Sequence, residues 1–304
     1  MKITRKKSFH ILQVFLFVAC LIFFIKIYGH EVYQEFKSPR FLNLHFIIVT
    51  FCFWTLLYLM KSLLTRELYR AINYNIALSE LFSLSIITSF LSYILPAGLS
   101  TAFKALYLKT RHNFRFMHFG GIEVFSFVVI YYGYLSFLLA GYISDVYFSN
   151  WTLYPISLVL LLIFPFCYKV FNLASKNKYP TFNAKIYIFA ILNDIFYILL
   201  LYHVVEVYVD GSITFSSILI WAAIIQFSQF INFTPGNLGV RELVMAFTAP
   251  LVSMSDQKGA LISVIIRLIS ILYTIIWLFY SYKVIFHNSK SGIFDYYKKF
   301  TNKV

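Results

Sequence analysis

The feature that most constrains this chain is a series of uninterrupted apolar runs, each about 20 residues long, which is the length an α-helix needs to cross a bilayer. The runs lie at Phe9–Tyr28, Phe41–Met60, Ile122–Tyr142, Leu153–Phe171, Ile186–Tyr208 and Leu261–Tyr282. Backbone polar groups in lipid must be bonded within their own segment, so the runs predict helices and not open strands. A transmembrane barrel is excluded, because its strands are about 10 residues of alternating polarity. The sequence therefore predicts an all-α polytopic integral membrane protein.

Composition supports this class and excludes others. Only 12% of the 304 residues are charged and 60% are hydrophobic, against about 25% charged in an ordinary soluble domain. The net charge of +14 comes from basic residues in short loops beside the runs, where lysine and arginine set membrane orientation. We therefore expect no nucleic-acid partner. The three cysteines, Cys20, Cys52 and Cys167, lie inside apolar runs, and we expect no disulfide framework, metal or cofactor.

The basic residues also predict the orientation. The N-terminal tail is basic, and the apolar run after it continues past Cys20, so we interpret it as an uncleaved first span. Lysine and arginine also gather after the second run and after the last run, and these loops should be cytoplasmic. The chain is predicted to lie in the plasma (inner) membrane with both termini in the cytoplasm.

Two apolar segments do not fit as simple spans. In the first, an arm from Asn75 to Leu95 is broken at Pro96, Ala97 and Gly98. The arm that follows, Leu99–Leu108, is too short to recross at about 1.5 Å per residue. Clusters of lysine and arginine flank this segment on both sides, so both flanking loops should lie in the cytoplasm. The segment therefore predicts a hairpin that enters and leaves from the cytoplasmic side.

The segment Ile213–Val252 repeats this pattern, with a breaker at Pro235, Gly236 and Asn237 and a second arm from Gly239. The basic C-terminus requires that this hairpin open to the outside. The sequence thus predicts about six full spans and two re-entrant helical hairpins. Eight simple spans is the alternative, and it places basic clusters on the wrong side.

The order of span, hairpin and span occurs twice. Pro96 and Pro235 are separated by the same number of residues as Ile122 and Leu261, so one copy aligns with the other. We interpret residues 41–142 and 186–283 as inverted repeat units within a single transmembrane domain of residues 1–304. Inverted repeats with broken helices are typical of secondary transporters.

Polar residues within the apolar segments are the candidate site, because charge inside a bilayer is costly. They gather in the second repeat: Arg241, Glu242, Arg267, Asp194, Gln226, Gln229 and Asn232. Lys104, and with it Glu123, is the counterpart in the first repeat. A purely structural role is the alternative, in which an arginine pairs with Asp194 or Glu242 and holds helices together. We expect the helix that begins after Gly239 to offer free N–H groups beside Arg241, an arrangement suited to phosphate or carboxylate.

The run from Phe233 to Glu242, followed by Arg267, resembles the P-G-G-L-G-x-R-E … R signature of the lysylphosphatidylglycerol synthase transmembrane region family. It departs from that signature at Asn237. The stretch from Pro96 to Lys104 is more weakly similar to the family's P-x-R-x-G-E-x-x-R pattern, with Gly98 in place of the arginine and Ser100 and Thr101 in place of the Gly-Glu pair. The resemblance implies a role in moving lipid or lipid-linked sugar between leaflets. The chain ends shortly after its last span, so we expect no soluble synthetase domain and no lipid aminoacylation.

Three functions stay open at this point. The first is a flippase-like transporter for an anionic lipid or a polyprenyl-phosphate-linked glycan in envelope biogenesis. The second is a membrane-embedded glycosyltransferase that uses a lipid-phosphate sugar donor, with an acidic base or metal ligand among Glu31, Glu35, Asp145, Glu206 and Asp210. The third is a non-catalytic scaffold for envelope-assembly proteins. The absence of a nucleophile motif or phosphate loop favours a protein that is not an enzyme.

Overall fold

The computed structural model describes residues 43–95, 98–147, 184–208, 213–229, 237 and 239–286, together with the isolated residues 22, 26, 30, 33, 159 and 163. The predicted spans Phe9–Tyr28 and Leu153–Phe171 lie outside these continuous ranges. Within the described ranges every element is helical and no strand occurs. This confirms the predicted class of polytopic helical membrane protein.

Four of the described helices are long and apolar enough to cross a membrane. They are α2 (Leu44–Arg70), α5 (Phe116–Tyr147), α7 (Ala184–Tyr208) and α10 (Asp256–Phe286). Helices α5, α7 and α10 each contain a predicted span. Helix α2 covers the predicted span Phe41–Met60 only from Leu44 onward, and it continues ten residues beyond Met60. The remaining helices are shorter: α3 (Leu78–Ile94), α4 (Leu99–His112), α8 (Phe215–Ser228) and α9 (Val240–Thr248), the last followed by a 3-10 turn at Ala249–Val252.

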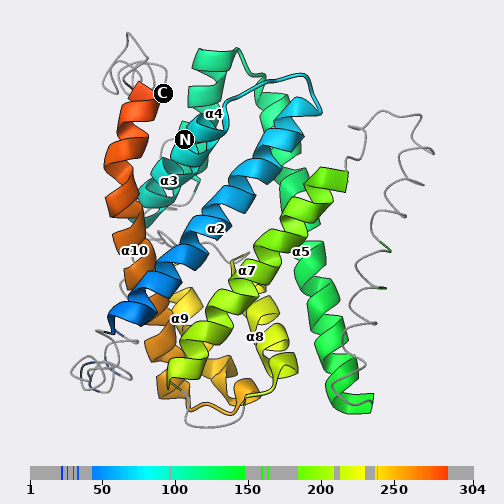
Figure 1. The fold of residues 1–304 in the computed structure, drawn as a ribbon, viewed down its shortest axis with the longest axis vertical. Helices are drawn as coiled ribbons and strands as arrows, with labels where there is room; N and C mark the ends of the chain where they lie inside the picture. Colours follow the sequence, from blue (N-terminus) through cyan, green and yellow to red (C-terminus); the bar gives the residue numbers. More distant parts are fainter. Residues whose placement is uncertain are drawn as a thin grey trace, which may run out of the picture.

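The short helices form two antiparallel pairs. Helix α3 runs from one end of the molecule towards its middle, and α4 returns beside it to the same end (Figure 1). Helices α8 and α9 form the equivalent pair from the opposite end (Figure 1). The second arm of each pair begins at a glycine in the left-handed region, Gly98 at φ 88° and Gly239 at φ 86°, where other residues are strained. Pro96, Pro235 and Gly236 lie outside the described residues.

Side chains fasten the two arms of each hairpin. In the first, the Tyr107 hydroxyl of α4 donates to the Glu80 carboxylate of α3 at 2.6 Å. In the second, the indole N–H of the fully buried Trp221 on α8 donates to the Thr248 hydroxyl of α9 at 2.8 Å. The first bond lies near the open end of its hairpin, and the second joins the middle of α8 to the end of α9.

Packing links the two halves of the chain. Helices α2 and α7, the first described spans of each half, pack against each other. Helix α3 packs along α10, and α8 packs along α5, so each hairpin lies against the last span of the other half. Because each hairpin packs on the other half, the inner ends of the two hairpins point towards the same central region.

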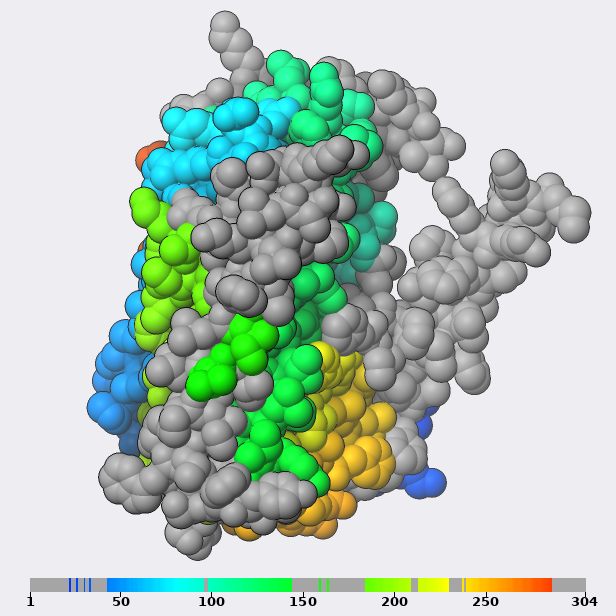
Figure 2. Space-filling model, turned by 90° about the vertical axis from the view of Figure 1, so that its right-hand side faces the viewer, coloured from blue at the N-terminus to red at the C-terminus, as the bar shows by residue number. Residues whose placement is uncertain are grey.

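The outer surface is apolar where a bilayer would touch it. On α5 a stripe of side chains is exposed at helical spacing: Val124, Val128, Leu135, Leu139 and Tyr142. The space-filling view shows α5, in green, along one face of the molecule, beside the lime segment of α7 and the yellow and orange residues of the second half (Figure 2). Exposed apolar residues on long helices fit contact with lipid.

Candidate functional site

A cavity of about 420 Å³ lies among the helices of both halves. Helices α2, α3, α5, α7, α9 and α10 and the end of α8 all contribute to it, so it is bounded by both hairpins. Its lining mixes aromatic rings with polar groups: Trp54, Tyr58, Lys61, Ser89, Tyr93, Glu123, Ser126, Tyr131, Tyr134, Asn193, Tyr197, Gln226, Gln229, Arg241 and Ser270. A polar cavity inside a membrane protein is a default candidate for a ligand site.

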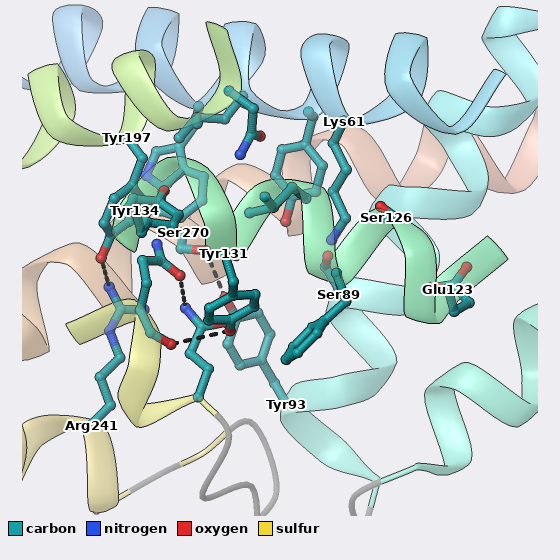
Figure 3. Close-up of a pocket in the computed structure, with 18 residues that line it drawn as sticks. Lys61, Ser89, Tyr93, Glu123, Ser126, Tyr131, Tyr134, Tyr197, Arg241 and Ser270 are labelled. Atoms are coloured by element: carbon teal, nitrogen blue, oxygen red, sulfur yellow. Dashed lines mark hydrogen bonds between the residues drawn. The ribbon is translucent and has the colours of Figure 1, made fainter. Parts of the chain in front are cut away.

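Arg241 supplies the cation of the second half. It lies in the first turn of α9, immediately after the Gly239 turn. One guanidinium nitrogen donates to the Tyr197 hydroxyl at 3.2 Å, and the Nε of Arg241 has no hydrogen-bond partner among the described residues. Figure 3 shows Arg241 reaching into the cavity towards Tyr197. Within the described part of the chain no carboxylate forms an ion pair with Arg241, so its fork remains available to an anion.

Lys61 and Glu123 lie towards the other side of the cavity (Figure 3). Glu123 of α5 is neutralised by Lys104 of α4, whose Nζ lies 2.6 Å from the carboxylate. Lys61 of α2 makes no ion pair with any residue that the structure describes. The charged groups of the lining are therefore two cations, Arg241 and Lys61, and one carboxylate, Glu123, which Lys104 neutralises; this balance favours an anionic ligand.

Neutral polar groups lie between the two charged regions. The Tyr93 and Ser270 hydroxyls are hydrogen bonded at 2.6 Å, joining α3 to α10. The Tyr131 hydroxyl donates to the Gln226 carbonyl at 3.1 Å, and the Gln229 amide donates to the Gln226 side chain. Hydroxyls and amides of this kind suit a hydroxylated or phosphate-bearing headgroup, because they both donate and accept.

Arg267 and Glu242 form an internal ion pair away from the cavity lining. Arg267 Nε lies 2.6 Å from Glu242 Oε1, and the side chains are only 9% and 4% exposed. Arg267 also donates to the Asn237 carbonyl at 3.3 Å. The other Glu242 oxygen accepts the Gly239 N–H at 2.7 Å, so part of the N-terminus of α9 is already bonded within the protein. This pair ties α9 to α10, as Lys104 and Glu123 tie α4 to α5.

Asp194 is fully buried in α7. From the residues that the structure describes it receives one hydrogen bond, from the Asn193 amide at 3.3 Å, and its Oδ2 has no partner among them. It pairs with neither arginine, so the structure does not bring it into the charged cluster that the sequence analysis considered.

The predicted residues thus separate into groups. Arg241, Gln226 and Gln229 line the cavity, and Lys104 lies behind it through Glu123. Arg267, Glu242 and Asp194 lie outside the lining, and Asn232 lies outside the described residues. Of the acidic residues considered for glycosyl transfer, only Glu206 has a described side chain, and it is exposed near the end of α7.

Sequence reasoning missed Lys61 as a site residue. The second span was predicted to end at Met60, so Lys61 was assigned to a cytoplasmic loop. The signal that could have found it is the apolar pair Leu63 and Leu64 just beyond, because α2 continues through them to Arg70. The tyrosines of the lining were also missed, since tyrosine is common at membrane interfaces.

Within the described ranges no group of histidine, cysteine and acidic residues is arranged to hold a metal. Fold and site together define a polytopic helical membrane protein with two short helical hairpins and a cationic cavity between them. The sequence profile of the lysylphosphatidylglycerol synthase TM region matches residues 11–277, and the chain belongs to that family. The family relation indicates a role connected with membrane lipid. No curated protein and no solved structure matches the chain.

Proposed function

We propose that this protein moves an anionic lipid, or a polyprenyl-phosphate-linked glycan, between the leaflets of the plasma (inner) membrane during envelope biogenesis. The observation that carries the proposal is the cavity, which holds Arg241 and Lys61 without carboxylate partners among the described residues. A cation left unpaired inside a membrane protein is costly unless a ligand or water solvates it. A phosphate headgroup supplies that counter-charge.

The chemistry of the lining fits a phosphate headgroup. An arginine fork binds two phosphate oxygens at once, whereas the lysine ammonium acts as a point charge that tolerates several headgroup positions. The cavity volume of about 420 Å³ lies at the lower end of the range of about 300–1,000 Å³ for small-molecule sites. It therefore suits a headgroup, with the acyl or prenyl chains remaining in the bilayer.

The arrangement of helices supports movement between leaflets. Residues 41–142 and 186–283 each supply a span, a hairpin and a span, and we propose that they are inverted repeats. The cavity lies between them, bounded by hairpins that enter from opposite ends (Figure 1). Transporters with this organisation open their site to each side in turn by moving one repeat against the other. In the proposed orientation both termini are cytoplasmic, and envelope-assembly proteins are the proposed partners.

The experiment is a leaflet-exchange assay. Purified protein in liposomes should speed the exchange of a fluorescent phosphatidylglycerol reporter, and the reporter should be recovered chemically unchanged. Protein-free liposomes, and liposomes that hold an unrelated helical membrane protein, are the controls. Formation of a new covalent product from a sugar-phosphate lipid donor would instead support the glycosyltransferase. No acceleration for phosphatidylglycerol or for a polyprenyl-phosphate reporter would refute the transport proposal.

A further inference from the structure

Asp194 is a buried acidic residue that takes no part in the proposed binding of a phosphate headgroup. It lies near the middle of α7, a helix long enough to span the membrane, and its exposed fraction is 0%. An ionised carboxylate in such a position is strongly destabilising unless it is paired or well hydrogen bonded. The state of this side chain therefore depends on its neighbours.

Those neighbours do not stabilise a negative charge. Among the described residues its only hydrogen bond is the long one from the Asn193 amide, and Oδ2 accepts none from them. No lysine, arginine or histidine in the described ranges forms an ion pair with Asp194. Arg241 instead donates to the neutral Tyr197 hydroxyl, and Arg267 pairs with Glu242. The packed arrangement is thus compatible with a protonated, neutral carboxyl group.

The helix contact at this point is unusually close. Gly133 of α5 faces Asp194, and a β-carbon at that glycine would lie only 2.0 Å from Oδ2. The carboxyl therefore fills the space that a side chain on α5 would need. An ionised carboxylate would require water or a cation, and placing either between Oδ2 and Gly133 requires α5 to move away from α7.

The carboxyl adjoins the cavity wall through the residue that precedes it in α7. Asn193, which donates to Asp194, also lines the cavity. The titratable groups that face Asp194 are the phenols of Tyr131 and Tyr134 on α5 and of Tyr187 on α7 itself. Helices α2, α8 and α10 present no charged group to it within the described residues. A change at Asp194 would thus act on the α5–α7 contact and on the adjoining wall of the cavity.

We propose that Asp194 is a proton-binding site whose occupancy is coupled to opening of the α5–α7 contact. The protonated carboxyl packs against Gly133 in the arrangement described here. Loss of the proton leaves a carboxylate that must be hydrated, which favours separation of α5 from α7 and admits water from the cavity through Asn193. Resting on the proposed function, this inference makes a pH difference across the membrane the energy source for headgroup movement.

The proton site is tested without any transport measurement. Infrared difference spectroscopy of the purified protein in liposomes should show the C=O band of a protonated carboxyl at neutral pH. The band should be missing in Asp194→Asn, and it should persist in Asp256→Asn, which removes an exposed carboxylate from the start of α10. Gly133→Ala should push α5 from α7 and abolish the band at a lower pH than in the wild type. A spectrum that is identical in the wild type and in Asp194→Asn would overturn the proposal.

Coupling is tested in the same liposomes with the fluorescent phosphatidylglycerol reporter. An imposed pH difference should speed exchange by the wild type, and Asp194→Asn should lose this dependence while it folds normally, because the amide mimics the neutral acid. If the band is present but wild-type exchange ignores the pH difference, the coupling is refuted. If the band is present but the wild type moves no lipid under any condition, the proposed function fails and the coupling fails with it, whereas the proton site stands.

Discussion

Removing Arg267 should destabilise the protein far more than removing an exposed arginine. The change Arg267→Ala leaves Glu242 with its Gly239 hydrogen bond but without a cation, at a position only 4% exposed. Breaking a buried pair by removal of one partner costs about 3–5 kcal/mol, because the remaining charge has no compensation. The comparison variant is Arg70→Ala, which breaks a contact with Glu67 at 2.9 Å; the arginine is 40% exposed and the carboxylate 9% exposed, so water reaches one side of this pair. An exposed pair contributes only about 0.2–1 kcal/mol.

The assay is unfolding in detergent micelles, combined with the amount of protein found in the membrane. Arg267→Ala should unfold much earlier and accumulate poorly, whereas Arg70→Ala should resemble the wild type. The double variant Arg267→Met and Glu242→Gln should recover most of the loss, because it removes both charges and keeps an acceptor for Gly239. Equal stability of Arg267→Ala and Arg70→Ala, or no recovery in the double variant, would refute the assignment of Arg267 and Glu242 as an internal pair.

Three further predictions concern the hairpins and the membrane orientation. Gly98→Ala and Gly239→Ala should each lower the free energy of unfolding by about 1–2 kcal/mol, because alanine is strained at a positive φ. The control is Gly120→Ala within α5, where an added β-carbon meets nothing within 4 Å among the described residues; equal shifts in thermal unfolding for all three variants would contradict the prediction. Lys104→Met should slow the exchange of an anionic lipid reporter, because Glu123 then brings an unpaired negative charge to the cavity. Adding Glu123→Gln should restore the exchange rate, and a rate that stays low in the double variant would count against a charge effect. In a cysteine-free background, Ser255→Cys before α10 should react with a membrane-impermeant reagent from outside and Arg115→Cys after α4 only after permeabilisation, and the reverse pattern would overturn the orientation.

The helical elements were predictable because breakers and apolar runs are local signals. Gly98 and Gly239 allow the sharp turns, and the apolar arm that follows each of them is too short to cross a bilayer. The structure has the arms close to the predicted positions, with α4 starting at Leu99 and α9 at Val240. The ends of helices were less predictable. A lysine that follows an apolar run, such as Lys61, predicts a loop in the sequence, although α2 continues past it.

The pairing of charges could not be predicted, because it depends on how distant helices face one another. The sequence left Arg241 and Arg267 equally suited to a site or to an internal pair. Packing of α9 on α10 gives Glu242 to Arg267 and leaves Arg241 beside Tyr197 in the cavity. Among the described residues, Asp194 contacts Gly133 on another helix and not a charged partner. A contact between two helices of this kind cannot be predicted from the spacing of residues along the chain.

The central claim is that Arg241 binds a phosphate headgroup in transit, and headgroup-selective exchange tests it most directly. Wild type, Arg241→Lys and Arg241→Gln should be compared in liposomes with a fluorescent phosphatidylglycerol reporter and a neutral glycolipid reporter. We expect wild type to favour the anionic reporter, Arg241→Gln to lose that preference, and Arg241→Lys to recover it only in part, since lysine lacks the bidentate fork. All three proteins should fold alike, because Arg241 carries no ion pair in the described structure. An anionic preference that survives Arg241→Gln unchanged would contradict the claim.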